Sequence, residues 1–145
     1  MTLGLRILLL DSVVGGLSVL NALRQRFPYA HLRLCADRAY YPYGEKPPSD
    51  LCAHFVAFAQ SMAAQFNPDV LVIACNTATT VALAQVRAAL DIPVIGTVPA
   101  IKPAAQLSHS GVIGVLATRS TVQGPYLQGL IDEYAQGKTV LHIHR

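Results

Sequence analysis

Charged residues, cysteines and long hydrophobic runs are all scarce in this sequence, and each shortage excludes a class of protein. Only 13% of the 145 residues are charged while 52% are apolar, which excludes a disordered chain and predicts a well-buried core. The apolar runs, such as residues 70–75, are far too short to cross a bilayer. The opening apolar stretch contains Arg6 and has no small-residue cleavage site, so we expect neither a leader peptide nor a membrane span.

Cysteine is present only at Cys35, Cys52 and Cys75, an odd number at wide spacings. This arrangement fits neither a disulfide framework nor a zinc site, so we expect a cytoplasmic, reducing location and no bound metal. Cys35 and Cys52 are expected core positions. The net charge of +3 is small and the basic residues are scattered. Without a cluster of Lys and Arg, neither nucleic acid nor a lipid surface is an expected partner.

Short apolar segments alternate with longer segments of helical periodicity, which is the pattern of βαβ units around a parallel sheet. Near-continuous apolar runs indicate strands that helices bury on both faces. The expected strands are residues 5–10, 31–36, 70–74, 94–96, 112–117 and 140–144. The expected helices are residues 17–26, 50–66, 80–90, 99–107 and 122–134, with Ser49 as a cap and Asn67-Pro68 as a stop for the second.

The chain is expected to have an α/β fold in two units. Residues 1–97 contain a full series of strands and helices, which predicts a flavodoxin-like parallel-sheet domain. Residues 98–145 contain a shorter series, which predicts the incomplete start of a second, similar domain. Such a unit should expose apolar surface and favour association, for example as a homodimer. Residues 37–49 carry three Tyr, three Pro and no helical period, so we expect an ordered functional loop or a lid there.

In a doubly wound sheet, ligands bind at the carboxyl ends of the strands. The residues at or just after the expected strand ends include a thiol, a carboxylate, an amide and several hydroxyls. They are Asp11, Ser12, Cys75, Asn76, Thr77, Thr118 and Thr121, together with Tyr43 and Gly44 in the loop after the second strand. We expect these groups to converge on one crevice.

Cys75 lies just before a helix, and the positive end of the helix dipole is expected to lower the pKa of its thiol from about 8.5. A thiolate there can serve as a general base toward a carbon acid. Asp11 can orient an ammonium group or assist proton transfer, while Ser12, Asn76 and Thr77 can hold a carboxylate. Two structural alternatives remain open from the residues alone: Cys75 as a small core residue, and Asp11 with Ser12 as a helix cap.

Other polar groups have structural interpretations. Gly15-Gly16 resembles a phosphate-binding turn but lacks the full G-x-G-x-x-G spacing. His142 and His144 share one face of the last strand without a third ligand, which favours a surface or interface position over a metal site. Lys46 lies beside prolines that do not suggest the desolvated pocket a Schiff-base lysine needs.

Taken in order, the motifs are similar to those of glutamate racemase. The similar segments are Asp11-Ser12-x-Val14-Gly15-Gly16-Leu17-Ser18-Val19-Leu20, Pro42-Tyr43-Gly44-x-Lys46, Ala74-Cys75-Asn76-Thr77-Ala78, Val98-Pro99-Ala100 and Gly114-Val115-Leu116-Ala117-Thr118. The resemblance runs from about Ile7 to the end of the chain with compatible spacing. Several motifs in order are more specific than any one of them.

The resemblance implies two similar α/β domains with the amino acid held between them, and racemisation without pyridoxal phosphate, metal or any other cofactor. It implies that one cysteine from each half moves the α-proton, the two acting from opposite faces. L- and D-glutamate would then interconvert, and D-glutamate would feed peptidoglycan synthesis. By this resemblance Cys75 is one base and Asp11 assists it. The implied substrate contacts are Ser12, Tyr43, Gly44, Asn76, Thr77, Thr118 and Thr121.

Two departures from the family pattern matter. Val13 stands where the family has glycine; if that position needs a positive φ or close approach to the ligand, valine would be strained or would crowd the site. The family's second cysteine, in a Cys-Thr-His motif, lies in the half after Arg145, and no cysteine follows Cys75 here. We therefore expect a truncated racemase that is weakly active or inactive as this chain.

Three other hypotheses compete with this one. The first is an aspartate or hydantoin racemase of the same superfamily, although Asn76-Thr77 and the Pro-Tyr-Gly loop favour glutamate. The second is a non-catalytic glutamate-binding or regulatory remnant, which would bind its ligand without turnover. The third is an unrelated flavodoxin-like nucleotide binder, which the incomplete glycine motif disfavours.

Overall fold

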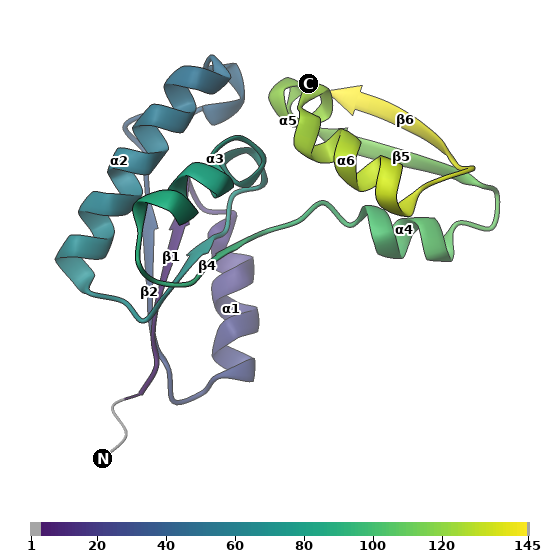
Figure 1. The fold of residues 1–145 in the computed structure, drawn as a ribbon. Helices are drawn as coiled ribbons and strands as arrows, with labels where there is room; N and C mark the ends of the chain where they lie inside the picture. The colour runs from purple at the N-terminus through teal and green to yellow at the C-terminus, as the bar shows by residue number, and fades with distance from the viewer. Residues whose placement is uncertain (1–3, 145) are drawn as a thin grey trace.

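The computed structural model describes residues 4–144, which form two parallel sheets with helices packed against them (Figure 1). The first sheet has the strand order β2-β1-β3-β4 and the second pairs β5 with β6. A segment at residues 97–100 connects the two sheets. The expected α/β class with a parallel sheet is therefore confirmed, and a second, smaller sheet begins after the first.

The first sheet contains β1 (Arg6–Asp11), β2 (His31–Ala36), β3 (Val70–Ile73) and β4 (Val94–Gly96). All its neighbouring strands run parallel, with Leu10 opposite Cys35 on one side and Ile73 on the other. Because the strands are parallel, their carboxyl ends meet at one edge of the sheet. The residues that follow β1, β2 and β3 are therefore gathered at that edge.

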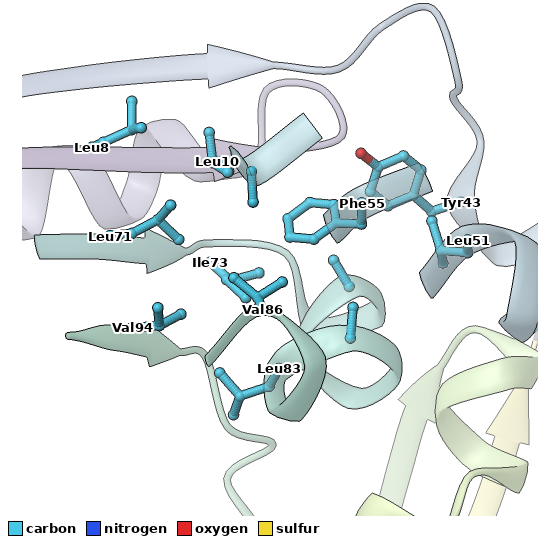
Figure 2. Close-up of a cluster of buried hydrophobic side chains, with 13 residues drawn as sticks. Leu8, Leu10, Tyr43, Leu51, Phe55, Leu71, Ile73, Leu83, Val86 and Val94 are labelled. Atoms are coloured by element: carbon cyan, nitrogen blue, oxygen red, sulfur yellow. The ribbon is translucent and has the colours of Figure 1, made fainter. Parts of the chain in front are cut away.

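Helices cover both faces of this sheet. On one face, Leu8, Leu10 and Ile73 pack against α2 (Pro48–Phe66) and α3 (Asn76–Ala89) in the largest apolar cluster, which Figure 2 shows. On the other face, Ile7 and Leu9 pack against α1 (Gly16–Arg26). Alternate residues of β1 thus point to opposite faces, and both sets are buried, which explains the uninterrupted apolar sequence of the strand.

The second sheet contains β5 (Val112–Ala117) and β6 (Thr139–His144), and the neighbouring helices are α4 (Ile101–Leu107), α5 (Arg119–Gln123) and α6 (Pro125–Tyr134). Ile113 and Val115 are buried in a cluster with residues of α4 and α6. The aliphatic side chains on the opposite face of β5 and β6 are exposed. They are Val112, Leu116, Leu141 and Ile143. One face of the β5–β6 pair is therefore aliphatic and open, as expected for a unit with little core of its own.

Three details of the expected helices were wrong. Residues 122–134 were expected as one helix, but Gly124 is extended and α6 begins at Pro125, because a proline disfavours helical geometry in the residue before it. The expected cap Ser49 instead lies in the first turn of α2, which begins at Pro48. Helix α3 begins at Asn76 rather than residue 80. The expected stop of α2 is confirmed, because Asn67 adopts the left-handed conformation.

Candidate active site

Cys75 lies at the carboxyl edge of the first sheet, in the position immediately before α3. Its Sγ is 3.9 Å from the Ser12 hydroxyl oxygen, which accepts a weak hydrogen bond from the thiol. Ser12 follows β1, so this contact joins the ends of two adjacent strands. The backbone N–H of Thr79 donates to the Cys75 carbonyl at 2.9 Å and fixes the start of the helix. Cys75 packs against the main core but is not fully buried, so the thiol is both positioned and reachable.

The environment of Cys75 favours the neutral thiol. Burial, together with the nearby Asp11 carboxylate, raises the pKa of Cys75 above its ordinary value of 9.0. The backbone N–H groups of Ala78 and Thr77 and the Ser12 hydroxyl act in the opposite direction, but they do not compensate. The expectation that the helix would lower the pKa of this thiol was therefore wrong, because desolvation of the thiolate outweighs the helix terminus.

Asp11 is the last residue of β1, and its side chain is only 4% exposed. Its two carboxylate oxygens accept the backbone N–H of Ser12 at 2.7 Å and of Gly16 at 2.5 Å. Position 16 is closely packed, since a Cβ there would lie 2.9 Å from Leu34 Cδ1 and 3.1 Å from Asp11 Cβ, and a larger residue would displace these side chains. Asp11 therefore organises the turn into α1 through its carboxylate, although the N-cap residue is Gly15 rather than Asp11 or Ser12. Asp11 also lies near the thiol of Cys75.

A pH profile of thiol alkylation tests the coupling between these two residues. We expect alkylation of Cys75 by iodoacetamide to keep rising above pH 9.0, because the raised pKa keeps the thiol protonated and only the thiolate reacts. Asp11→Asn should shift the profile to lower pH by removing the negative charge. Peptide mass spectrometry separates Cys75 from Cys35 and Cys52. A midpoint of the wild-type profile below pH 9.0 would contradict this account.

Four threonine hydroxyls connect the first sheet's helix α3 with α5. Thr77 and Thr118 place their Oγ1 atoms 3.0 Å apart, and Thr118 also lies 3.0 Å from Thr121 Oγ1. Thr80 completes the group, since its Oγ1 is 3.5 Å from that of Thr121 and donates to the Thr77 carbonyl. The structure therefore brings together three residues expected from sequence, and adds Thr80, which the sequence analysis did not single out.

Tyr43 and Gly44 lie in a 3-10 turn, η1 (Tyr43–Glu45), and have different environments. The Tyr43 side chain is 2% exposed, and its ring packs edge-on against Phe55 (Figure 2). Its hydroxyl donates to Asp37 Oδ2 at 2.7 Å. Gly44 approaches the threonine group so closely that a Cβ on it would lie 2.7 Å from Thr118 Cγ2. Gly44 thus lies at the site, whereas the phenol of Tyr43 is part of the core.

Asn76 and Ser12 complete the set of expected site residues. Asn76 is exposed, and Ser12 is half-buried. Asn76 and Thr121 line a cavity of about 270 Å³ between the start of α3 and the residues of α4 and β5. Asn76, Thr77, Thr118 and Thr121 are therefore neighbours, and they connect α3 with the start of α5. Ser12 contacts Cys75, the residue before Asn76.

Two larger cavities lie elsewhere. One of about 840 Å³ surrounds the amino ends of β1 and β2, and one of about 910 Å³ lies between α2, α3 and α5. Neither Cys75 nor Asp11 lines any of the three cavities, but Asn76, the residue next to Cys75, lines the smallest of them. By volume alone, one of the two larger cavities would be selected as the ligand site. The titratable groups and hydroxyls, however, gather at the carboxyl edge of the sheet, where parallel sheets bind ligands. We therefore place the candidate site at Cys75.

Val13 carries no backbone strain. Among residues 4–144, Asn67 is the non-glycine residue with a positive φ, so position 13 does not need glycine for its conformation. Val13 is half-buried. A positive φ is therefore not what the family glycine supplies here, and crowding of a bound ligand by Val13 stays a prediction.

The remaining polar residues do not form a metal site. Within residues 4–144, no three side chains of His, Cys, Asp or Glu gather closely enough to hold a metal ion. His142 and His144 are exposed on β6, and the Lys46 ammonium lies over the Tyr40 ring at 5.0 Å. In the same described range, no helix has the length and apolar character needed to cross a membrane.

Comparison with known proteins identifies the family. A family model described as Asp/Glu/Hydantoin racemase matches residues 18–141. The chain belongs to this family. It is 52% identical over 135 residues to a glutamate racemase of Sphingopyxis alaskensis, a match that covers 93% of this chain and 50% of the relative.

Solved structures of glutamate racemases also resemble this chain. The crystal structure of Escherichia coli glutamate racemase, in complex with L-glutamate and the activator UDP-MurNAc-ala, resembles this chain with a TM-score of 0.90 and 39% identity. That match covers 97% of this chain and 53% of the other. Glutamate racemase from Aquifex pyrophilus has a TM-score of 0.85 and 32% identity, covering 95% and 54%. The chain thus spans about half the length of the relatives it matches.

Proposed function

We propose that this chain supplies one face of a glutamate racemase site, with Cys75 as the base that removes or returns the α-proton of glutamate. The observation that carries the proposal is a reachable thiol at the carboxyl edge of the sheet, 3.9 Å from the Ser12 hydroxyl and beside the buried Asp11. Membership of the racemase family, and the L-glutamate bound to the E. coli relative, support the assignment of glutamate as the substrate.

The surrounding residues have distinct proposed roles. Asp11 assists the proton transfer and holds Ser12 and Gly16 through its carboxylate. Ser12, Asn76, Thr77, Thr118 and Thr121 hold the carboxylates and the ammonium group of the substrate. Gly44 contributes backbone at close range, and Tyr43 contributes its backbone, because its phenol is bonded to Asp37. No cofactor takes part in the proposed reaction.

Proton transfer by a single thiol has a defined outcome. Cys75 thiolate takes the α-proton, and the electron pair of the C–H bond stays on the α-carbon, where the substrate carboxylate stabilises it. The thiol exchanges its proton with solvent and returns a solvent proton to the same face. Inversion needs a second base on the opposite face, and no cysteine follows Cys75 in this sequence. We therefore propose that this chain alone exchanges the α-proton of one enantiomer and racemises weakly or not at all.

The wider context of the proposal follows from the family. In this proposal one α/β domain spans residues 1–97 and a second begins within residues 98–145, with the substrate between them. The open aliphatic face of β5 and β6 favours association, with a homodimer as the simplest form. The product D-glutamate would serve peptidoglycan synthesis in the cytoplasm.

Ligand-induced stabilisation tests the substrate. At ten times its Kd, a ligand stabilises the folded state by about 1.4 kcal/mol, which raises the Tm by several degrees. We expect such a rise with D- or L-glutamate, a smaller one with aspartate and none with ATP. In Thr118→Val the glutamate-induced rise should fall, whereas in Thr139→Val, which removes a hydroxyl from exposed β6, it should persist. A larger shift with aspartate, or a shift with ATP alone, would contradict the proposal.

The alternative of a glutamate-binding remnant without turnover is favoured by one observation. The pKa of Cys75 is raised by burial in the unliganded chain, so little thiolate is present near neutral pH. A remnant would show the glutamate-induced rise in Tm without exchange of the α-proton at any pH. The two functions therefore differ in one measurable step.

A further inference from the structure

A buried carboxylate outside the proposed catalytic group connects the Tyr43 turn to the rest of the domain. Asp37 directly follows β2 and is 8% exposed. Its Oδ2 accepts hydrogen bonds from the Tyr43 hydroxyl at 2.7 Å and from the ring N–H of His54 at 2.5 Å. One oxygen atom thus joins a loop residue and a helix residue to the carboxyl edge of the sheet.

His54 reaches this carboxylate from α2. Its ring stacks on Tyr40, with centroids 3.9 Å apart and planes inclined by 14°. Lys46, from the same loop as Tyr40, places its ammonium over the Tyr40 ring, 5.0 Å from the ring centroid. His54 therefore contacts the loop at two points, through a hydrogen bond to Asp37 and through a stacked ring. Neither His54, Asp37 nor Tyr40 has a role in the proposed proton transfer.

The loop held in this way borders the candidate site. Burial and the bonded Asp37 raise the pKa of the Tyr43 phenol most, and Cys75 and Asp11 lie close enough to add to that rise. The adjacent Gly44 packs against Thr118. Asp37 also donates its backbone N–H to the Asp11 carbonyl at 2.9 Å, which ties the start of the loop to the end of β1. Displacement of the Tyr43 turn would therefore move the groups beside Cys75.

We propose that His54 is a positioning residue, which through Asp37 and Tyr43 locks residues 38–46 beside the candidate site. The effect of this lock on glutamate affinity rests on the proposed function, whereas its effect on the loop itself does not. The hydrogen bond to a buried carboxylate is the essential contact, because removing one donor leaves the carboxylate oxygen partly unsatisfied and weakens its hold on the turn.

Three variants separate the lock from general stability. His54→Leu removes the donor, and His54→Gln keeps an N–H donor on a side chain of similar reach. Gln60→Leu makes the same polar-to-leucine change at an exposed position of α2 and serves as the matched control. Hydrogen–deuterium exchange of residues 38–46 and the iodoacetamide alkylation rate of Cys75 report on the loop without any ligand. Isothermal titration calorimetry with D-glutamate reports on the substrate.

In His54→Leu we expect exchange in residues 38–46 to accelerate by about tenfold, the factor expected for the loss of one hydrogen bond to a charged group. Cys75 should alkylate several-fold faster than in the wild type. Both values should return toward wild type in His54→Gln and stay unchanged in Gln60→Leu. Alkylation of Cys35 should not change, which separates loop opening from global unfolding.

The outcomes separate the lock from the proposed function. Unchanged exchange and alkylation in a folded His54→Leu protein would overturn the proposal. So would uniform acceleration throughout the chain, because that result indicates general destabilisation. If the loop opens as expected but the wild-type chain does not bind D-glutamate, the lock stands and the substrate assignment fails. If D-glutamate binds, we expect its Kd to rise at least about tenfold in His54→Leu and less in His54→Gln.

Discussion

Cys75→Ser should abolish exchange of the α-proton of glutamate with solvent deuterium, lowering the rate by at least about a hundredfold. The serine hydroxyl has nearly the same size and can still contact Ser12, but it ionises far too weakly to act as the base. The wild-type rate should increase with pH to above 9.0, because burial and Asp11 raise the pKa of the Cys75 thiol. Proton NMR of the α-position in D2O measures both the rate and its pH dependence.

Cys52→Ser is the matched control, because it makes the same atomic change at another half-buried thiol that packs against the main core. This variant should retain the wild-type exchange rate. Cys75→Ser should also retain the glutamate-induced rise in Tm, since the thiol is proposed to act on the proton rather than to hold the substrate. Exchange that persists in Cys75→Ser would show that another group is the base.

Phe55→Ala should have the largest effect on stability. Phe55 is fully buried on α2, and its ring packs edge-on against Tyr43 at a centroid distance of 5.9 Å (Figure 2). It also packs edge-on against Phe58 at 6.0 Å. Truncation of a buried phenylalanine costs about 3–5 kcal/mol, through the lost transfer free energy and the cavity that remains. Urea denaturation followed by circular dichroism should show this loss as a lower midpoint.

Phe27→Ala provides the comparison, because Phe27 is 44% exposed at the end of α1 and loses the same atoms. We expect its midpoint to change much less than that of Phe55→Ala. Equal losses in the two variants would contradict the placement of Phe55 at the centre of the core. The contact with Tyr43 also makes Phe55 a support of the loop beside Cys75, although it lies outside the site.

Most of the strands could be predicted from the sequence. The strands His31–Ala36, Val94–Gly96 and Val112–Ala117 have the expected bounds, because short apolar runs between helical segments determine them directly. The start of α3 could not be predicted. Residues 76–80 are Asn, Thr, Ala, Thr and Thr, which have low helix propensity apart from the alanine, and burial of Thr77, Ala78 and Thr79 decides their conformation.

The candidate site was predicted less completely than the fold. The order of motifs identified Cys75, Asp11 and the threonines, and the structure places Cys75 near Asp11 and joins Thr77, Thr118 and Thr121. Thr80, His54 and the Asp37 carboxylate were missed, because their role depends on tertiary contacts that leave no periodic or motif signal. The position of Asp37 at the end of an expected strand was the one available indication.

The pKa of Cys75 shows why the position of a cysteine in the sequence is insufficient to predict the ionisation of its thiol. A cysteine before a helix predicts a stabilised thiolate, and backbone N–H groups of α3 do stabilise it here. Burial and the negative charge of Asp11 have the larger effect. The balance depends on how closely the core and β1 approach the thiol, which the sequence does not specify. The sequence therefore predicts the position of Cys75 but not the pKa of its thiol.

The central claim is that this chain carries one base on one face of the substrate. Its most direct test is to incubate L- and D-glutamate separately with the purified chain in D2O at pH 9, and to follow the α-proton by NMR and the configuration by circular dichroism. We predict deuterium uptake into one enantiomer with retention of configuration. Equal exchange of both enantiomers with decay of the ellipticity would contradict the single base, and absence of exchange in both would contradict the role of Cys75.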